Sequence, residues 1–166
     1  MKNLFEQHKA ILPDDLRYGV LRTEVLEHPG LYGGKLGMAI LFYSYSRYAK
    51  DPLYERFADE VVDSVLELSN ELPMRFSDGL TGIGWGITYL LREEFIAGDI
   101  DEILSEIDSV LEKGKLFNDA GEIGYQTYQY FRSRYKNPDI RLQLPGGIYM
   151  EGEVLRLIWD SCLSRK

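Results

Sequence analysis

Two segments of the chain carry a single apolar stripe. Apolar residues recur every three or four positions in residues 53–71, with acidic residues between them, and residues 100–113 repeat the pattern. This spacing places the apolar side chains on one face of an α-helix. Asp99 is placed to cap the second helix and Gly114 to end it. The pattern therefore predicts two amphipathic helices, over 53–71 and 100–113.

The segment that precedes each amphipathic helix is apolar all round. Residues 36–49 and 86–96 both have this composition, which is typical of a helix buried on several sides. The chain is thus predicted to alternate buried inner helices with amphipathic outer ones. Residues 4–12 and 15–27 predict one or two further helices, whereas "IRLQL" at 140–144 alternates like a strand but is expected to be a loop.

A repeat organises this alternation. "GLYGGKLG" at 30–37 and "GLTGIGWG" at 79–86 share the pattern G-L-x-G-x-x-x-G at an offset of 49 residues. Helical hairpins that repeat at a fixed period must stack on their neighbours, because one hairpin cannot bury its own apolar faces. We therefore expect one all-α domain over residues 1–166. Its clearest repeats are 30–78 and 79–118, and a weaker third at 119–166 contains the segments "GEIGYQTYQYFRSRY" and "YMEGEVLRLIWDSCL".

The repeated glycines do not form a nucleotide-binding loop. "GGKLG" lacks the Gly-Lys-Ser/Thr ending and the preceding strand of a phosphate loop, and no βαβ pattern surrounds either copy. We expect instead that Gly30 and Gly79 adopt positive φ in turns. Four further glycines are expected to let helix ends approach closely: Gly33, Gly37, Gly82 and Gly86.

Charge and composition narrow the partners. The 166 residues have a formal net charge of −8, which argues against nucleic acid and is compatible with a cationic peptide. No apolar run approaches the length of a membrane span, and the charged N-terminal residues do not resemble a signal peptide, so a cytoplasmic protein is expected. The single cysteine, Cys162, is expected to be a buried, inert thiol.

The repeated G-L-x-G-x-x-x-G motif at the head of buried helices, with amphipathic helices between, resembles the lanthionine synthetase C-like family. The likeness is clearest over residues 30–113, and "DGLTGIGWGITYLL" is its most specific stretch. It implies an (α/α) toroid, related in architecture to the six-hairpin glycosidases. The hairpins present would form a partial ring, so self-association or docking on a partner protein is expected, with the C-terminal "VLRLIWDSCL" as one candidate surface.

Family members hold a catalytic zinc with two cysteines and a histidine. This sequence has one cysteine, and His8 and His28 lie outside the repeat, so those ligands do not carry over and we expect neither zinc nor another cofactor. The resemblance then implies a non-catalytic protein that binds a peptide or a partner enzyme in a peptide-modification system. The alternative is a small carbohydrate-active or carbohydrate-binding α/α-toroid protein.

The resemblance also implies a ligand site where loops lead into the inner helices. The residues predicted to line this mouth are Tyr32, Lys35, Asp78, Thr81 and Trp85, and the third repeat adds Asp119, Glu122 and Tyr125. In the carbohydrate alternative, Trp85 stacks on a sugar while Asp78, Asp119 or Glu122 serves as acid or base. Structural roles compete with both hypotheses: Asp78 as a helix cap, Trp85 as core and Lys35 as an ordinary surface lysine.

Overall fold

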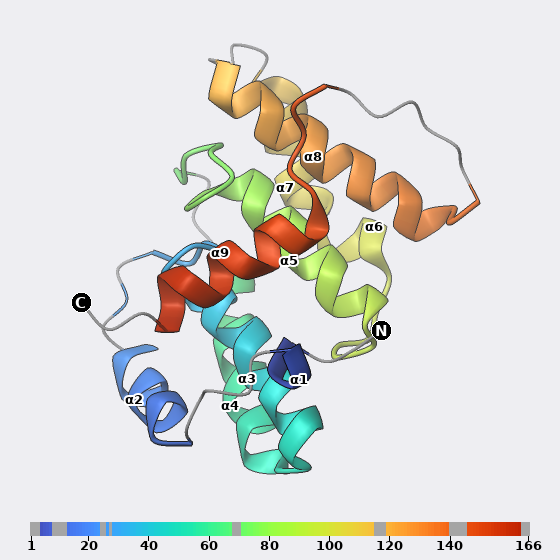
Figure 1. Ribbon diagram of the computed structural model, residues 1–166. Coiled ribbons are helices and arrows are strands. Elements are labelled where there is room, and N and C mark those ends of the chain that lie inside the picture. The colour runs from blue at the N-terminus through green and yellow to red at the C-terminus, as the bar shows by residue number, and fades with distance from the viewer. Residues whose placement is uncertain are drawn as a thin grey trace. The chain divides into compact units, whose positions relative to one another are not determined.

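The protein is described by a computed structural model, shown in Figure 1. The described residues are 4–7, 13–23, 26, 28–67, 71–114, 119–139 and 146–163. Over these residues the regular secondary structure is helical and contains no strand, which confirms the predicted all-α class. The segment at 140–144 lies outside the described residues.

Residue contacts divide the chain into two compact units. Unit 1 comprises residues 1–68 and 155–166, and unit 2 comprises residues 69–154. The helix α9 (Glu151–Leu163) contributes its first residues to unit 2 and the remainder to unit 1. The single domain and the toroidal arrangement of the hairpins stay predictions.

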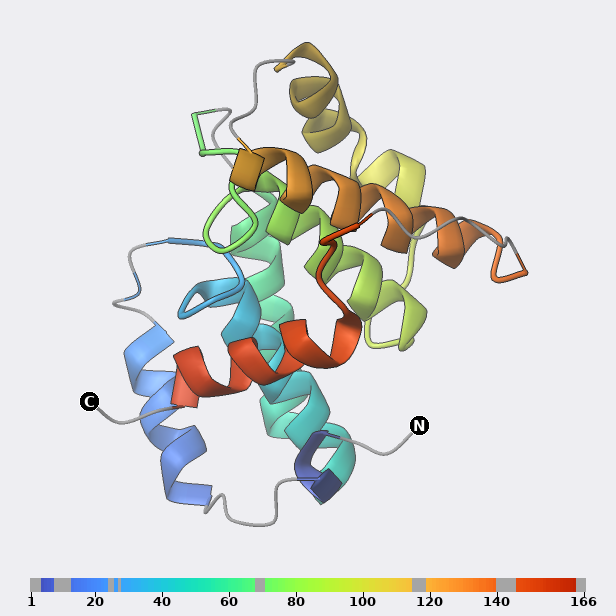
Figure 2. The same cartoon turned by 45° about the horizontal axis from the view of Figure 1, so that its top comes forward.

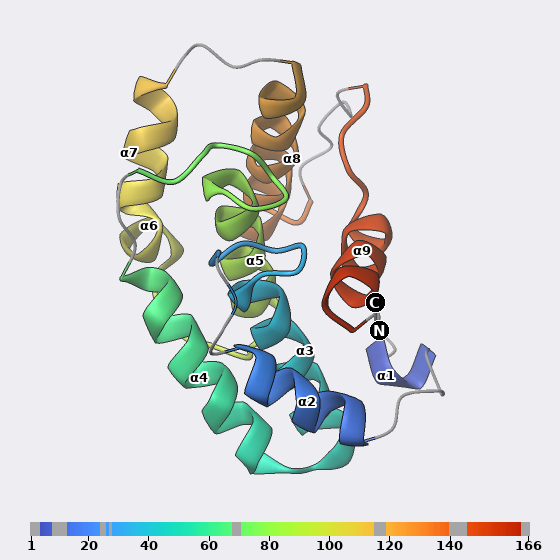
Figure 3. The same cartoon turned by 90° about the vertical axis from the view of Figure 1, so that its left-hand side faces the viewer.

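Unit 1 is built on a helical hairpin. Its helices besides α9 are α1 (Leu4–Gln7), α2 (Pro13–Thr23), α3 (Lys35–Ala49) and α4 (Pro52–Leu66). The helices α3 and α4 pack side by side (Figure 3). Asp51 accepts a hydrogen bond from the amide of Leu53 at 3.1 Å and so caps α4, while the hydroxyl of Tyr43 donates to Asp59 at 2.6 Å and joins the two helices.

Unit 2 is centred on a fully buried helix. Its other helices besides α9 are α5 (Leu80–Arg92), α6 (Ile100–Ile103), α7 (Ser105–Lys113) and α8 (Asp119–Lys136). Each residue of α5 from Leu80 to Leu91 is buried. The orange helix α8 lies against the green helix α5 in Figures 1 and 2. A Cβ added to Gly84 would lie 2.6 Å from the ring of Tyr128, so glycine permits this close packing.

Helix boundaries differ from the predictions in three places. The inner helix predicted over 86–96 runs from Leu80 to Arg92 instead, because the glycines of its motif lie inside the helix rather than before it. The outer helix predicted over 100–113 is interrupted at Leu104, where ψ changes to 8°. The helix predicted over 53–71 ends at Leu66, and residues 68–70 lie outside the described residues.

The heads of α3 and α5 are capped by loop backbone instead of side chains. The carbonyls of His28, Pro29 and Gly30 accept hydrogen bonds from the first three amides of α3, at 3.1, 3.2 and 3.2 Å. The carbonyl of Pro73 accepts similarly from Leu80 at 2.9 Å. These bonds satisfy amides that have no partner within the helix itself.

Gly37 and Gly79 allow the loop backbone to lie this close to the first turns of α3 and α5. A Cβ on Gly37 would overlap the carbonyl oxygen of Leu31, and one on Gly79 would overlap that of Pro73. The prediction of positive φ at Gly30 and Gly79 is wrong. Gly79 is extended, with φ −129°, and Gly33 has the positive φ, 67°. The first motif is looped up to Gly34, whereas the second enters its helix at Leu80, so aligned glycines occupy different conformations.

We expect Gly37→Ala and Gly79→Ala each to lower the free energy of unfolding by about 1–3 kcal/mol, because the added methyl meets a backbone carbonyl that has little room to move. Urea unfolding followed by circular dichroism measures this change. Gly152→Ala is the control: Gly152 lies in α9 with nothing within 4 Å of an added Cβ, so alanine should be neutral or stabilise by up to about 1 kcal/mol. Equal effects at all three glycines would contradict the explanation.

Candidate functional site

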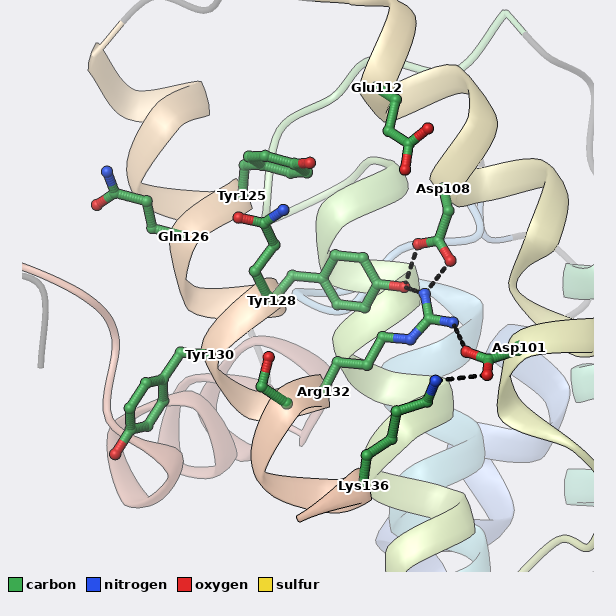
Figure 4. Close-up of a pocket in the computed structure, with 11 residues that line it drawn as sticks. Asp101, Asp108, Glu112, Tyr125, Gln126, Tyr128, Tyr130, Arg132 and Lys136 are labelled. Carbon is green, nitrogen blue, oxygen red and sulfur yellow. Dashed lines mark hydrogen bonds and ion pairs between the residues drawn. The ribbon is translucent and has the colours of Figure 1, made fainter. Parts of the chain in front are cut away.

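A groove of about 520 Å³ in unit 2 is lined by polar, charged and tyrosine side chains. It lies between α6 and α7 on one side and α8 on the other (Figure 4). We call it the polar groove. Its lining residues are Asp101, Asp108, Glu112, Tyr125, Gln126, Tyr128, Gln129, Tyr130, Arg132, Ser133 and Lys136.

Helical spacing aligns the central side chains of the polar groove. Tyr128, Arg132 and Lys136 are four residues apart on α8, so they share one face of that helix. Asp101 on α6 and Asp108 on α7 lie opposite them. The sequence pattern thus presents a row of donors on α8 to two carboxylates.

Five side chains form one connected network. The hydroxyl of Tyr128 donates to Asp108 at 2.7 Å, and the guanidinium of Arg132 donates to the other carboxylate oxygen of Asp108 and to the hydroxyl of Tyr128. Arg132 also donates to Asp101 at 2.7 Å, and the ammonium of Lys136 completes the row at Asp101. Each charge in the network therefore has an opposite charge beside it.

The network fixes the protonation states of Asp101 and Tyr128. The hydrogen bonds from Lys136 and Arg132 lower the pKa of Asp101, so this carboxyl stays ionised. Burial raises the pKa of Tyr128, and its hydrogen bond to Asp108 adds to the rise. Tyr128 therefore remains a neutral phenol whose hydroxyl donates a hydrogen bond to Asp108.

One end of the polar groove has a carboxylate that no described cation pairs with. Glu112 makes no hydrogen bond or ion pair with any residue that the structure describes, and its carboxylate points towards the groove beside Tyr125 in Figure 4. Burial raises the pKa of Tyr125, and the charges of Glu112 and Asp108 raise it further. This end joins an aromatic ring to an exposed carboxylate, a combination suited to a cationic group.

Of the residues predicted to line a shared mouth, two belong to the core of unit 2. Thr81 is fully buried and its hydroxyl donates to the carbonyl of Met74 at 2.7 Å. Trp85 is 1% exposed, and its ring stacks with those of Tyr89 and Phe131 at 5.5 and 4.8 Å between ring centroids. Both side chains thus have structural partners.

The other three predicted residues are more accessible. Asp78 receives two hydrogen bonds from the guanidinium of Arg75, at 3.0 and 2.7 Å, and α5 is capped at Gly79 rather than by this carboxylate. Tyr32 and Lys35 are half-buried residues of unit 1. Because Asp78, Thr81 and Trp85 belong to unit 2, the shared mouth stays a prediction.

The third-repeat candidates have separate outcomes. Tyr125 lines the polar groove, and Glu122 is an exposed residue of α8. The side chain of Asp119 lies outside the described part of the structure. In unit 1, Cys162 is a buried free thiol, as predicted, and burial raises its pKa.

Sequence reasoning missed the centre of the polar groove. The row at 128, 132 and 136 and the pair of aspartates seven residues apart, at 101 and 108, are visible in the sequence. The first pattern places its side chains on one face of α8, and the second would do the same on the single helix predicted over 100–113. Together they could have indicated a polar contact between α8 and the segment that forms α6 and α7.

No protein-family model, curated protein or solved structure matches this chain. Within the described ranges, no helix is long and apolar enough to cross a membrane. The described residues likewise contain no group of three or more His, Cys, Asp or Glu side chains that could hold a metal ion.

We expect Tyr128→Phe to lower the free energy of unfolding by about 1–3 kcal/mol, because it removes the partly buried hydrogen bond to Asp108 and the acceptor of a hydrogen bond from Arg132. Urea titration measures the change. Tyr130→Phe is the matched control: its hydroxyl is engaged only by Arg134, at 3.5 Å, among the described residues, so a change below about 0.5 kcal/mol is expected. A similar loss of unfolding free energy in both variants would show that the hydrogen bond to Asp108 does not stabilise the fold more than the weak contact of Tyr130 does.

We expect Lys136→Gln to raise the pKa of Asp101, because the ammonium is the largest cause of its lowered value. A lowered pKa in the folded protein stabilises the fold above the ordinary carboxyl pKa of about 3.9, and this stabilisation disappears as the pH falls through the folded value. In the variant, the folded pKa of Asp101 should lie closer to the ordinary value, so the stabilisation should be smaller and should be lost at a higher pH. Carboxyl ¹³C chemical shifts followed against pH report the titration directly. Lys113→Gln, on α7 outside the groove lining, should leave the Asp101 titration unchanged.

Proposed function

We propose that this protein is a non-catalytic lanthionine synthetase C-like protein that binds a cationic peptide in a peptide-modification system. The observation that carries the proposal is the acidic end of the polar groove, where the carboxylate of Glu112 lies beside Tyr125. The family relationship rests on the repeated glycine motif, and the binding site rests on the geometry of unit 2.

Charge supports a cationic ligand. Three carboxylates, Asp101, Asp108 and Glu112, and two cations, Arg132 and Lys136, line the groove, which leaves one negative charge. The whole chain is also acidic, with a formal net charge of −8. A lysine or arginine side chain of the ligand would pair with Glu112 and lie against the ring of Tyr125, an ion pair combined with a cation–π contact.

The network favours binding over catalysis. Catalytic acids and bases need a proton that they release or accept near the working pH. Asp101 is held as a carboxylate by Lys136 and Arg132, and Tyr128 is held as a phenol by burial. Both side chains therefore support a fixed surface for recognition.

The residues present do not fit the family's zinc site. That site uses two cysteines, and the single cysteine here is buried, with a thiol pKa raised by burial. Metal ligation requires the thiolate, which burial disfavours. We therefore assign no step to a metal.

The carbohydrate alternative has weaker support. It requires the face of Trp85 for stacking on a sugar, but this ring is 1% exposed and stacks with Tyr89 and Phe131. It also requires Asp78, Asp119 or Glu122 as acid or base: the carboxylate of Asp78 is paired with Arg75, and Glu122 is an exposed residue of α8. The stacked ring of Trp85 and the paired carboxylate of Asp78 are therefore not available to contact a glycan.

The proposal is tested by calorimetric titration with a lysine-rich hexapeptide, acetylated and amidated at its ends, and with the same peptide carrying acetyl-lysine. Only the charged peptide should bind, and salt should weaken it. We expect Glu112→Gln to weaken binding about two- to fivefold, the loss of one exposed ion pair.

Glu106→Gln is the matched control, since Glu106 is an exposed glutamate of the same helix that does not line the groove. It should bind like the unaltered protein. Equal binding of both peptides, or equal effects of the two substitutions, would refute the site. Saturable binding of a neutral oligosaccharide in place of the peptide would favour the carbohydrate alternative.

A further inference from the structure

Unit 2 contains a second pocket, of about 420 Å³, with a different chemical character. We call it the aromatic pocket. It uses residues of α8 that point away from the salt-bridged row at 128, 132 and 136, together with the segment before α9. Its walls include Trp85, Phe131, Tyr149 and Met150, and two arginines, Arg92 and Arg134, line it as well.

The apolar wall is rigidly built. The rings of Trp85 and Phe131 stack at 4.8 Å with 18° between their planes. The ring of Tyr149 packs on that of Phe76, with 5.1 Å between the ring centroids, and the backbone amide of Tyr149 donates to the hydroxyl of Thr127 at 3.0 Å. Trp85 is buried behind Phe131, so the half-buried side chains of Phe131 and Tyr149 present the preformed surface to a flat apolar ligand.

The two arginines of the aromatic pocket differ in their partners. Arg92 donates to both Glu93 and Glu151, and its guanidinium lies 4.9 Å from the centroid of the Phe131 ring. Two carboxylates therefore already compensate its charge. Arg92 completes the wall and has little capacity left for a ligand anion.

Arg134 has no such compensation. Its guanidinium contacts the hydroxyl of Tyr130 and the carbonyl of Pro138, each at 3.5 Å, the limit of a hydrogen bond. Both acceptors are uncharged, and no carboxylate among the described residues pairs with this exposed side chain. In a chain with a formal net charge of −8, an arginine without a carboxylate beside an apolar pocket is suited to an external anion.

We propose that the aromatic pocket binds an aromatic carboxylate. The ring of the ligand would pack on the aromatic wall, and its carboxylate would pair with the guanidinium of Arg134, a geometry that arginine favours through two parallel hydrogen bonds. A free aromatic acid and the C-terminal aromatic residue of a peptide share this chemistry. The site goes beyond the cationic-peptide function because it selects the opposite charge and shares only Tyr130 with the lining of the polar groove.

Two ligands that differ only in charge test the proposal: N-acetyl-L-phenylalanine and N-acetyl-L-phenylalaninamide. Binding is followed by calorimetry and by the fluorescence of Trp85 in a Trp159→Phe background, since Trp159 lies in unit 1. The acid should bind about tenfold more tightly than the amide, the value of one charge-assisted hydrogen bond. Arg134→Gln should abolish that preference, and Arg56→Gln, at an exposed arginine of α4, should preserve it.

The mouth of the pocket offers a second test that does not threaten the fold. Met150 is 57% exposed, so a charge there should be tolerated. Met150→Glu should weaken binding of the acid and Met150→Lys should strengthen it, each about two- to fivefold, while binding of the amide changes little. Equal affinity for acid and amide, or absence of binding by either at millimolar concentration, would overturn the inference. So would equal effects of the Arg134 and Arg56 substitutions.

The source of the ligand is then resolved with a tetrapeptide ending in phenylalanine, compared with the same peptide amidated at its C-terminus. Tighter binding of the acid peptide than of N-acetyl-L-phenylalanine identifies peptide C-termini, and exclusion of the peptide identifies small acids. Glu112→Gln should change neither the preference for acid over amide nor the relative affinity for the peptide and the small acid. Failure of the aromatic pocket is thereby separable from failure of the polar groove.

Discussion

The structure depends on a close approach of backbone to backbone at the heads of α3 and α5. In each case a loop folds back so that its carbonyls accept hydrogen bonds from first-turn amides, at 2.9–3.2 Å. A helix that begins inside the protein cannot leave these amides to water, and an unsatisfied buried amide costs about 1–3 kcal/mol. The loop reaches the helix only because Gly37 and Gly79 lack a Cβ. The glycines are thus explained by packing and capping, without a bound phosphate.

This capping allows α5 to be buried on every side, and the polar groove follows from that burial. The absence of a side chain at Gly84 lets the ring of Tyr128 pack against α5. The ring is 1% exposed, yet its hydroxyl reaches Asp108 on α7. A buried hydroxyl requires a partner, and the partner fixes how α7 and α8 face each other. Arg132 then bridges Asp108 and Asp101, so one apolar contact sets the position of a charged network.

Local patterns predicted the elements of the fold better than its site. The stripe that begins at Leu53 and the all-round apolar segment at 36–49 predicted α4 and α3 because burial imposes periodicity on adjacent residues. The start of α5 was misplaced because its glycines resemble a loop, and only the fold shows that they lie within a packed helix. The network of Asp101, Asp108 and Arg132 depends on which helices meet. No local pattern specifies that pairing, so the row on α8 and the two aspartates are visible in the sequence only as separate patterns.

The two candidate sites arise from one helix with two polar faces. On one face of α8, Arg132 and Lys136 are neutralised by aspartates, so the charge left over in the polar groove is the negative one of Glu112. On another face, Arg134 meets only neutral acceptors and leaves a positive charge beside aromatic rings. A ligand group is recognised by charge that the protein has not already compensated, so paired arginines contribute rigidity and unpaired charges contribute selectivity. The same residue type therefore serves the fold at 132 and recognition at 134, and the difference lies in the carboxylates that the neighbouring helices supply.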